Sequence, residues 1–223
     1  MKKIILTIDS STSSSTTMAW DLKGNLIFKT TKKIKLINPK TGYYEQNAQE
    51  WKYALIDNLK KISSKLKSYE ILSICITNQR ETFVPVDRNC VPLRPAITWL
   101  DERCTKEVLS LSKKIGKKNF HKITGKNIDI IPSIFKIEWI KHNERNIFNK
   151  TYKFLDVQSF LIWFLINEFK TSWASSDSTG IFDVKNKKWS KEILKKLGLK
   201  ESHFPKSYKP GTLIGRISKE AAY

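Results

Sequence analysis

The chain has 223 residues, of which 40% are hydrophobic, 11% aromatic and 28% charged, and its 41 basic residues against 21 acidic ones give a formal charge of +20. This length allows one large or two small domains with a real hydrophobic core, and it excludes a short module held together by disulfides. The composition is that of a globular protein, which excludes the disordered and fibrous classes.

The N-terminal part of the chain predicts an antiparallel meander of three strands. Runs typical of strands cover Lys3 to Ile8, Thr17 to Asp21 and Leu26 to Leu36. The small polar residues from Asp9 to Ser15 join the first two strands, and Lys23-Gly24-Asn25 forms the second turn. A carboxylate at the end of a buried strand, followed by hydroxyls, suits phosphate and hydrated Mg²⁺, so this first loop is a candidate phosphate site; an ordinary turn is the alternative.

An amphipathic helix and a further strand follow the meander. Asn47 caps a predicted helix over Ala48 to Leu66, whose apolar residues recur at three- and four-residue steps. Ile71 to Thr77 is a nearly continuous apolar run, which is typical of a strand buried on both faces of a sheet. Because a helix separates this strand from the meander, we expect an α/β layered fold.

Polar residues directly after that strand form a second candidate site. Asn78-Gln79-Arg80-Glu81-Thr82 lies at the edge where α/β sheets place ligands. Arginine beside glutamate offers a fork of donors and two acceptor oxygens, which suits vicinal hydroxyls, although an ion pair that closes the loop has the same sequence. Trp99 with Asp101 and Arg103 is a similar set, in which an aromatic ring lies beside polar groups. The alternative is that Trp99 belongs to the core and that Asp101 caps a helix.

The remaining pattern predicts one compact unit with an insertion at about residues 79–135. A short strand at Thr82 to Val86 and a segment ending in Ala96 to Trp99 precede the predicted helices, which cover Asp101 to Ile115, Ser133 to His142, Asp156 to Asn167 and Ser190 to Leu197. At the end of the chain, Ile214 to Ser218 predicts a strand and Lys219 to Tyr223 the start of a helix.

Three further observations limit the classes of partner. The longest apolar run, Phe160 to Ile166, is far shorter than the ~20 residues of a membrane span, and the N-terminus lacks a signal peptide, so we expect a cytoplasmic protein without a membrane partner. Only six of the 41 basic residues are arginine, which favours a solvated lysine-rich surface over a nucleic-acid binder. Three cysteines without a CxxC pair and three scattered histidines favour neither a disulfide nor a metal cluster.

Six segments, in this order, resemble the N-terminal half of the FGGY carbohydrate kinases, the family of glycerol kinase and xylulokinase. They are TIDSSTSSSTTMAWDLKGNLI, GYYEQNAQEW, ITNQRET, PAITWLDER, TGKNIDIIPSIFKIEW and STGIFDVKNKKWSKEILKKLGL. The resemblance implies an α/β fold of the ribonuclease H and actin-like ATPase type, a mixed sheet with flanking helices. Residues 1–223 would be the sugar-binding N-terminal domain, and the C-terminal nucleotide-binding domain is absent from this chain.

The resemblance also implies a reaction and a site. ATP and Mg²⁺ would be the cofactors, and the γ-phosphoryl group would pass to a hydroxyl of a small polyol or ketose, similar to glycerol or xylulose. Asp9 would face Mg²⁺ through water, Thr12 and Ser13 would face phosphate, and Arg80, Glu81, Trp99 and Asp101 would bind the substrate. The general-base aspartate would lie beyond Tyr223, so we expect the isolated chain to be inactive, and the full-length enzyme could form a homodimer.

The chain departs from the family pattern at three positions. Ser11 stands where the family has glycine, Thr16 where it has lysine or arginine, and Ile131 where glycerol kinase has a tyrosine near its substrate. The first two departures concern phosphate handling, and the third concerns glycerol as the substrate. The alternative function is therefore a truncated or degenerate kinase half that binds a sugar or a partner without catalysis.

Overall fold

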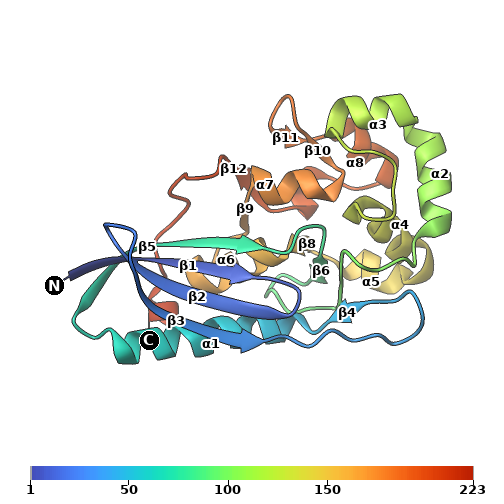
Figure 1. Cartoon of the computed structure of the whole chain (residues 1–223). Coiled ribbons are helices and arrows are strands. Elements are labelled where there is room, and N and C mark those ends of the chain that lie inside the picture. The colour runs from blue at the N-terminus through green and yellow to red at the C-terminus, as the bar shows by residue number, and fades with distance from the viewer. Residues whose placement is uncertain (1, 223) are drawn as a thin grey trace.

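The first sheet confirms the predicted meander and the α/β class. The structure is a computed structural model that describes residues 2–222. Its first sheet contains β1 (Lys2–Ser10), β2 (Ser14–Asp21), β3 (Leu26–Lys33) and β5 (Tyr69–Asn78), in the order β3-β2-β1-β5 (Figure 1). The strands β1, β2 and β3 are antiparallel, whereas β5 runs parallel to β1, with Ser10 beside Asn78. The two parallel strands therefore end at the same edge of the sheet.

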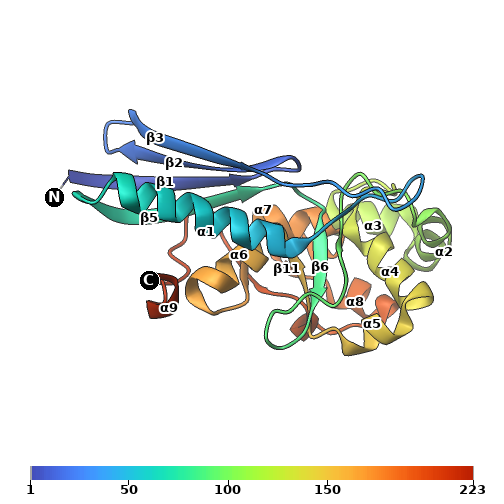
Figure 2. The same cartoon turned by 90° about the horizontal axis from the view of Figure 1, so that it is seen from below.

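Two helices, α1 (Ala48–Lys65) and α6 (Val157–Ile166), lie on the same face of this sheet (Figure 2). The predicted cap is confirmed, because the Asn47 side chain accepts a hydrogen bond from the backbone N–H of Gln49. Trp51 of α1 packs edge-on against Phe160 of α6, with ring centroids 5.6 Å apart. Burying the apolar faces of both helices against the sheet forms one core of the molecule.

The expectation that Ile71 to Thr77 is buried on both faces is wrong. Ile71 is 42% exposed and Leu72 46% exposed, because β5 ends the hydrogen-bonded order of its sheet and the helices cover only one face. The side chain of Gln158 links β5 to the next strand, β9 (Lys170–Ser172). Its amide donates to the Ile76 carbonyl at 2.7 Å and accepts from the Ser172 N–H at 3.0 Å. Strand β9 pairs with β12 (Lys206–Tyr208).

A second sheet and a group of helices form the other half of the molecule. The sheet has the order β4-β7-β6-β8, from Glu45–Gln46, Ala96–Ile97, Phe83–Val86 and Lys153–Asp156. The helices α2 (Thr105–Ile115), α3 (Lys117–Thr124), α4 (Ser133–Asn143) and α5 (Arg145–Lys150) lie beside it (Figure 1). The insertion at about 79–135 stays a prediction, and the strands in that range pair with β4 and β8 from outside it.

The C-terminal part consists of short elements. They are α7 (Trp173–Ser176), the 3₁₀ turn η1 (Asp177–Thr179), β10 (Phe182–Asp183), β11 (Lys188–Trp189), α8 (Lys191–Leu197), η2 (Glu201–His203) and α9 (Lys219–Ala222). The predicted strand at Ile214 to Ser218 is wrong, since this segment has no strand partner and is irregular. Helix α9 matches the predicted helix start, whose last residue, Tyr223, lies outside the described residues. Between Lys2 and Ala222, no helix is both long and apolar enough to cross a membrane.

Candidate active site

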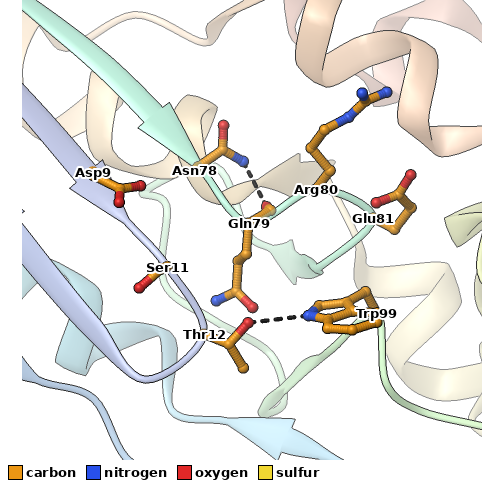
Figure 3. A pocket seen from close by; sticks show the side chains of 8 residues that line it. All are labelled: Asp9, Ser11, Thr12, Asn78, Gln79, Arg80, Glu81 and Trp99. Atoms are coloured by element: carbon orange, nitrogen blue, oxygen red, sulfur yellow. Dashed lines mark hydrogen bonds between the residues drawn. The ribbon is translucent and has the colours of Figure 1, made fainter.

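A pocket opens where β1 and β5 end. Its volume is about 350 Å³, within the range of small-molecule sites, and its lining residues are Asp9, Ser11, Thr12, Asn78, Gln79, Arg80, Glu81 and Trp99 (Figure 3). Five of the residues singled out from the sequence therefore come together: Asp9, Thr12, Arg80, Glu81 and Trp99. Ser13 and Asp101 do not line the pocket. The position matches the strand-end edge that α/β sheets offer to ligands.

The turn between β1 and β2 forms one side of the pocket. Ser11 closes this turn, because both its N–H and its hydroxyl donate to the Ser14 carbonyl at 2.9 Å. Thr12 faces the pocket, whereas Ser13 is exposed at the tip of the turn. Within residues 2–222, no hydrogen bond or ion pair engages the Asp9 carboxylate, which leaves its oxygens free for a ligand.

The oxygens on this side fit a hydrated magnesium ion. Carboxylate, hydroxyl and amide oxygens come from Asp9, Thr12 and Asn78, which are hard ligands of the kind that Mg²⁺ prefers. The described residues hold no group of three or more acidic, histidine or cysteine side chains that could surround a metal. An ion at Asp9 would therefore keep most of its water shell, as Mg²⁺ usually does.

Arg80 and Glu81 form the opposite side. Arg80 donates from Nη2 to Asp177 Oδ1 at 2.5 Å. Glu81 has a left-handed backbone with φ of +60°, which is held by two hydrogen bonds. Its N–H donates to Ser178 Oγ at 3.2 Å, and its carbonyl accepts from Ser133 Oγ at 2.8 Å. Such a strained conformation is uncommon for glutamate, and strain of this kind clusters at functional sites.

The Glu81 carboxylate lies in a partly desolvated position. Burial raises the pKa of this carboxyl, while the charges of Arg80 and Lys126 oppose the rise. The Lys126 Nζ lies 3.8 Å from Glu81 Oε1. A carboxylate in this setting accepts hydrogen bonds from ligand hydroxyls in a medium less polar than water, which strengthens each bond.

Trp99 is held in place by three contacts. Its indole Nε1 donates to Thr12 Oγ1 at 3.0 Å, and its backbone N–H donates to Thr82 Oγ1 at 3.1 Å. Its carbonyl accepts from Lys136 Nζ, which also donates to the carbonyls of Thr98 and Ile131. The ring therefore forms a fixed apolar wall, and its indole joins the two sides of the pocket.

Two buried glutamines complete a closed chain of hydrogen bonds behind the pocket. Gln46 Nε2 donates to the Thr12 carbonyl at 2.6 Å and its Oε1 accepts from Gln79 Nε2 at 2.6 Å. Gln79 Oε1 in turn accepts from Thr82 Oγ1 at 3.1 Å, which leads back to Trp99 and Thr12. No local sequence signal marks Gln46 as a functional residue. For Lys136, the signal is a lysine among the apolar residues of the segment IFKIEWI.

Asp101 occupies a buried structural position. Its carboxylate accepts from the Tyr44 N–H at 2.7 Å and from the Arg103 Nε and Nη2 at 2.8 and 2.7 Å. The Arg103 guanidinium also stacks over Tyr43 and Trp139. Helix α2 therefore begins at Thr105, and the prediction that Asp101 opens it is wrong, because this carboxylate holds Arg103 instead. A substrate contact for Asp101 stays a prediction that this geometry does not favour.

Comparisons with known proteins agree with the resemblance. The model of the FGGY family of carbohydrate kinases, N-terminal domain, matches residues 4–223. The chain is 26% identical to a xylulose kinase of Staphylococcus xylosus, over 97% of this chain and 45% of that protein. It is 31% identical to a glycerol kinase of Caldanaerobacter subterraneus, over 98% of this chain and 46% of that protein.

Solved structures show the same fold. The gluconate kinase from Lactobacillus acidophilus matches with a TM-score of 0.94 at 22% identity, over 100% of this chain and 45% of that one. Plasmodium falciparum glycerol kinase with ADP matches with a TM-score of 0.94 at 27% identity, over 99% of this chain and 46% of that one. The chain thus spans a little under half the length of the relatives it matches, and the expected ribonuclease H-like, actin-like fold is confirmed.

Proposed function

The chain belongs to the FGGY family of carbohydrate kinases, and from this premise we propose that it is the sugar-binding half of an ATP-dependent kinase. Its acceptor is a hydroxyl of a small polyol or ketose. The observation that carries this proposal is the single pocket that joins the Asp9 carboxylate and the Thr12 turn to Arg80, Glu81 and Trp99. One side offers oxygens for a hydrated cation and hydroxyls for phosphate, and the other offers paired donors and acceptors beside an aromatic wall.

Five residues of the pocket, and Ser13 of the neighbouring turn, have a part in this mechanism. Asp9 would hold hydrated Mg²⁺. Thr12 in the pocket, and Ser13 at the exposed tip of the same turn, would face the phosphate groups. Arg80 donates to, and Glu81 accepts from, neighbouring hydroxyls, which fixes the substrate, while Trp99 covers its apolar face. ATP and Mg²⁺ supply the phosphoryl group and neutralise its charge when bound. The base that takes the hydroxyl proton is expected beyond Tyr223.

The remaining properties are proposed on the same grounds. The acceptor resembles glycerol or xylulose, and the protein works in the cytoplasm without a nucleic-acid or membrane partner. The full-length enzyme could pair as a homodimer. Ser11 lies in the turn and Thr16 in β2, and both side chains are uncharged, so neither presents a cation to phosphate. The Thr16 Oγ1 shares a hydrogen bond with Thr31 Oγ1 at 3.0 Å.

The proposal is tested by sugar binding to the purified 223-residue chain. Dissociation constants for glycerol, xylitol and D-xylulose would be measured by ligand-observed NMR for the wild type, Arg80→Ala and Arg145→Ala. Losing a charged donor costs about 1.5–3 kcal/mol, so we expect Arg80→Ala to weaken binding about ten- to hundredfold. Arg145 is an exposed arginine of α5 and serves as the matched control. Equal affinities for all three proteins would place the sugar elsewhere.

A further inference from the structure

Arg80 contributes the positive charge of the pocket lining, but its guanidinium is already engaged. Figure 3 shows the Arg80 side chain extending away from Thr12, Gln79 and Trp99. Its Nη2 lies 2.5 Å from Oδ1 of Asp177, the first residue of η1. The side chains of Arg80 and Asp177 are 46% and 35% exposed. Arg80 lines the pocket and Asp177 does not, so Asp177 acts on a ligand in the pocket through its ion pair with Arg80.

The lysines near the pocket are engaged as well. Lys126 faces the Glu81 carboxylate at 3.8 Å, and the fully buried Lys136 directs its Nζ at three backbone carbonyls. By contrast, the Asp9 carboxylate forms no hydrogen bond and no ion pair within residues 2–222. The described pocket therefore presents carboxylates, and the cations around it already face acceptors.

We propose that Asp177 is a specificity-determining residue, which makes the pocket select neutral polyols and ketoses over sugar acids such as aldonates. This inference rests on the proposed function and names its substrate class. A neutral hydroxyl can donate to Glu81 and accept from Arg80, so it leaves the ion pair between Arg80 and Asp177 in place. A substrate carboxylate can only accept, and it must compete with Asp177 for Arg80 while lying close to Glu81 and Asp9.

The energetic consequence follows from like charges. A carboxylate brought beside Asp177 and Glu81 meets repulsion, and displacing Asp177 from Arg80 would leave a second carboxylate unpaired. The repulsion between a substrate carboxylate and Asp177 therefore contributes to the discrimination as much as the attraction of substrate hydroxyls to Arg80. Removing the Asp177 charge leaves Arg80 free to form a bidentate pair with a carboxylate ligand, which is the contact that guanidinium groups make best.

The test compares neutral and anionic probes on the 223-residue chain. Dissociation constants for glycerol, xylitol, D-xylulose and D-gluconate would be measured by ligand-observed NMR at 0.15 M salt. At this ionic strength, the general attraction of a protein with a charge of +20 for anions is screened. The variants are Asp177→Asn, Asp177→Ser and Asp177→Asn combined with Arg80→Gln. Glu168→Gln, which removes the same charge from an exposed glutamate paired with Lys170, is the matched control.

We expect the wild type to bind D-gluconate at least tenfold more weakly than its best neutral ligand. Both Asp177 variants should tighten gluconate binding about tenfold and change neutral binding less than threefold. The added Arg80→Gln change should abolish the gain, and Glu168→Gln should produce none. Two results overturn the inference and leave the proposed function intact. In the first, the wild type binds gluconate as tightly as it binds the neutral ligands. In the second, neutral ligands bind but the Asp177 variants bind gluconate no more tightly than the wild type does. If no probe binds any protein, the proposed function fails and this inference fails with it.

Discussion

Lys136 shows, at the scale of one residue, how burial changes the chemistry of a side chain behind the pocket. The side chain is completely buried, and its Nζ donates to three backbone carbonyls at 3.1–3.2 Å. Desolvation lowers the pKa of Lys136 to about 8, against smaller opposing effects of Cys104, Asp101 and Glu81. The lysine thus fixes the Trp99 wall, and it does so at the cost of burying a charge.

This cost predicts a pH dependence of stability. Below pH 8 the lysine is charged in both folded and unfolded chains, so the full cost is present, on the order of 3 kcal/mol for a shift from 10.5 to about 8. Between pH 8 and 10.5 the folded state loses the proton first, and the free energy of unfolding rises with pH. Chemical denaturation at pH 7 and pH 9.5 should show this rise in the wild type and not in Lys136→Met. Parallel pH profiles for the two proteins would contradict it.

At the scale of elements, the chain of hydrogen bonds through Gln46, Gln79 and Thr82 joins the first sheet to the second. Gln46 belongs to β4, Gln79 follows β5, and Thr82 precedes β6. Their amides and hydroxyl hold the Thr12 turn and Trp99 in one closed arrangement. Because every member is buried or nearly so, removing one leaves its neighbours without partners.

We therefore predict that Gln79→Leu loosens the pocket wall. Unpaired buried groups cost about 1–3 kcal/mol, so the variant should lose stability by this amount and bind polyols about tenfold more weakly. The indole N–H resonance of Trp99, assigned with Trp99→Phe, should exchange with solvent faster, a change that lost stability remote from the pocket would not produce. Gln49→Leu on α1 is the control. Unchanged exchange at Trp99 would show that the wall is held without the glutamines.

Local elements could be predicted from the sequence, whereas contacts between distant segments could not. The meander and the Asn47 cap follow from periodicity and from residues next to each other. Asp9, Arg80 and Trp99 were placed in one pocket through the family resemblance. By contrast, Gln46 meets Gln79 across 33 residues, and Arg80 meets Asp177 across 97. The exposure of Ile71 was missed because an apolar run does not show which faces of a sheet are covered.

At the scale of the whole molecule, the pocket takes its lining residues from both halves of the structure. One core lies between the first sheet, α1 and α6, and the other lies among α2, α3, α4 and α8 with β6 and β8. Asp9 and Thr12 belong to the half that contains the first sheet, and Trp99 follows β7 of the second sheet. In the proposed function, this pocket holds the sugar and presents one face to phosphate, and the catalytic step depends on what else reaches that face.

We predict that the purified 223-residue chain releases no ADP above background when it is given ATP, Mg²⁺ and a panel of polyols and ketoses. Phosphoryl transfer needs a base within hydrogen-bond reach of the acceptor hydroxyl and a nucleotide aligned at about 3–3.5 Å. In the proposed function, the pocket carboxylates Asp9 and Glu81 bind the cation and the substrate hydroxyls. Asp101 accepts hydrogen bonds from Tyr44 and Arg103. A coupled ADP-release assay checks this, with a full-length homologue as the positive control. Sugar-dependent turnover that Asp101→Asn abolishes and Glu168→Gln preserves would contradict it, because the base would then lie inside this chain.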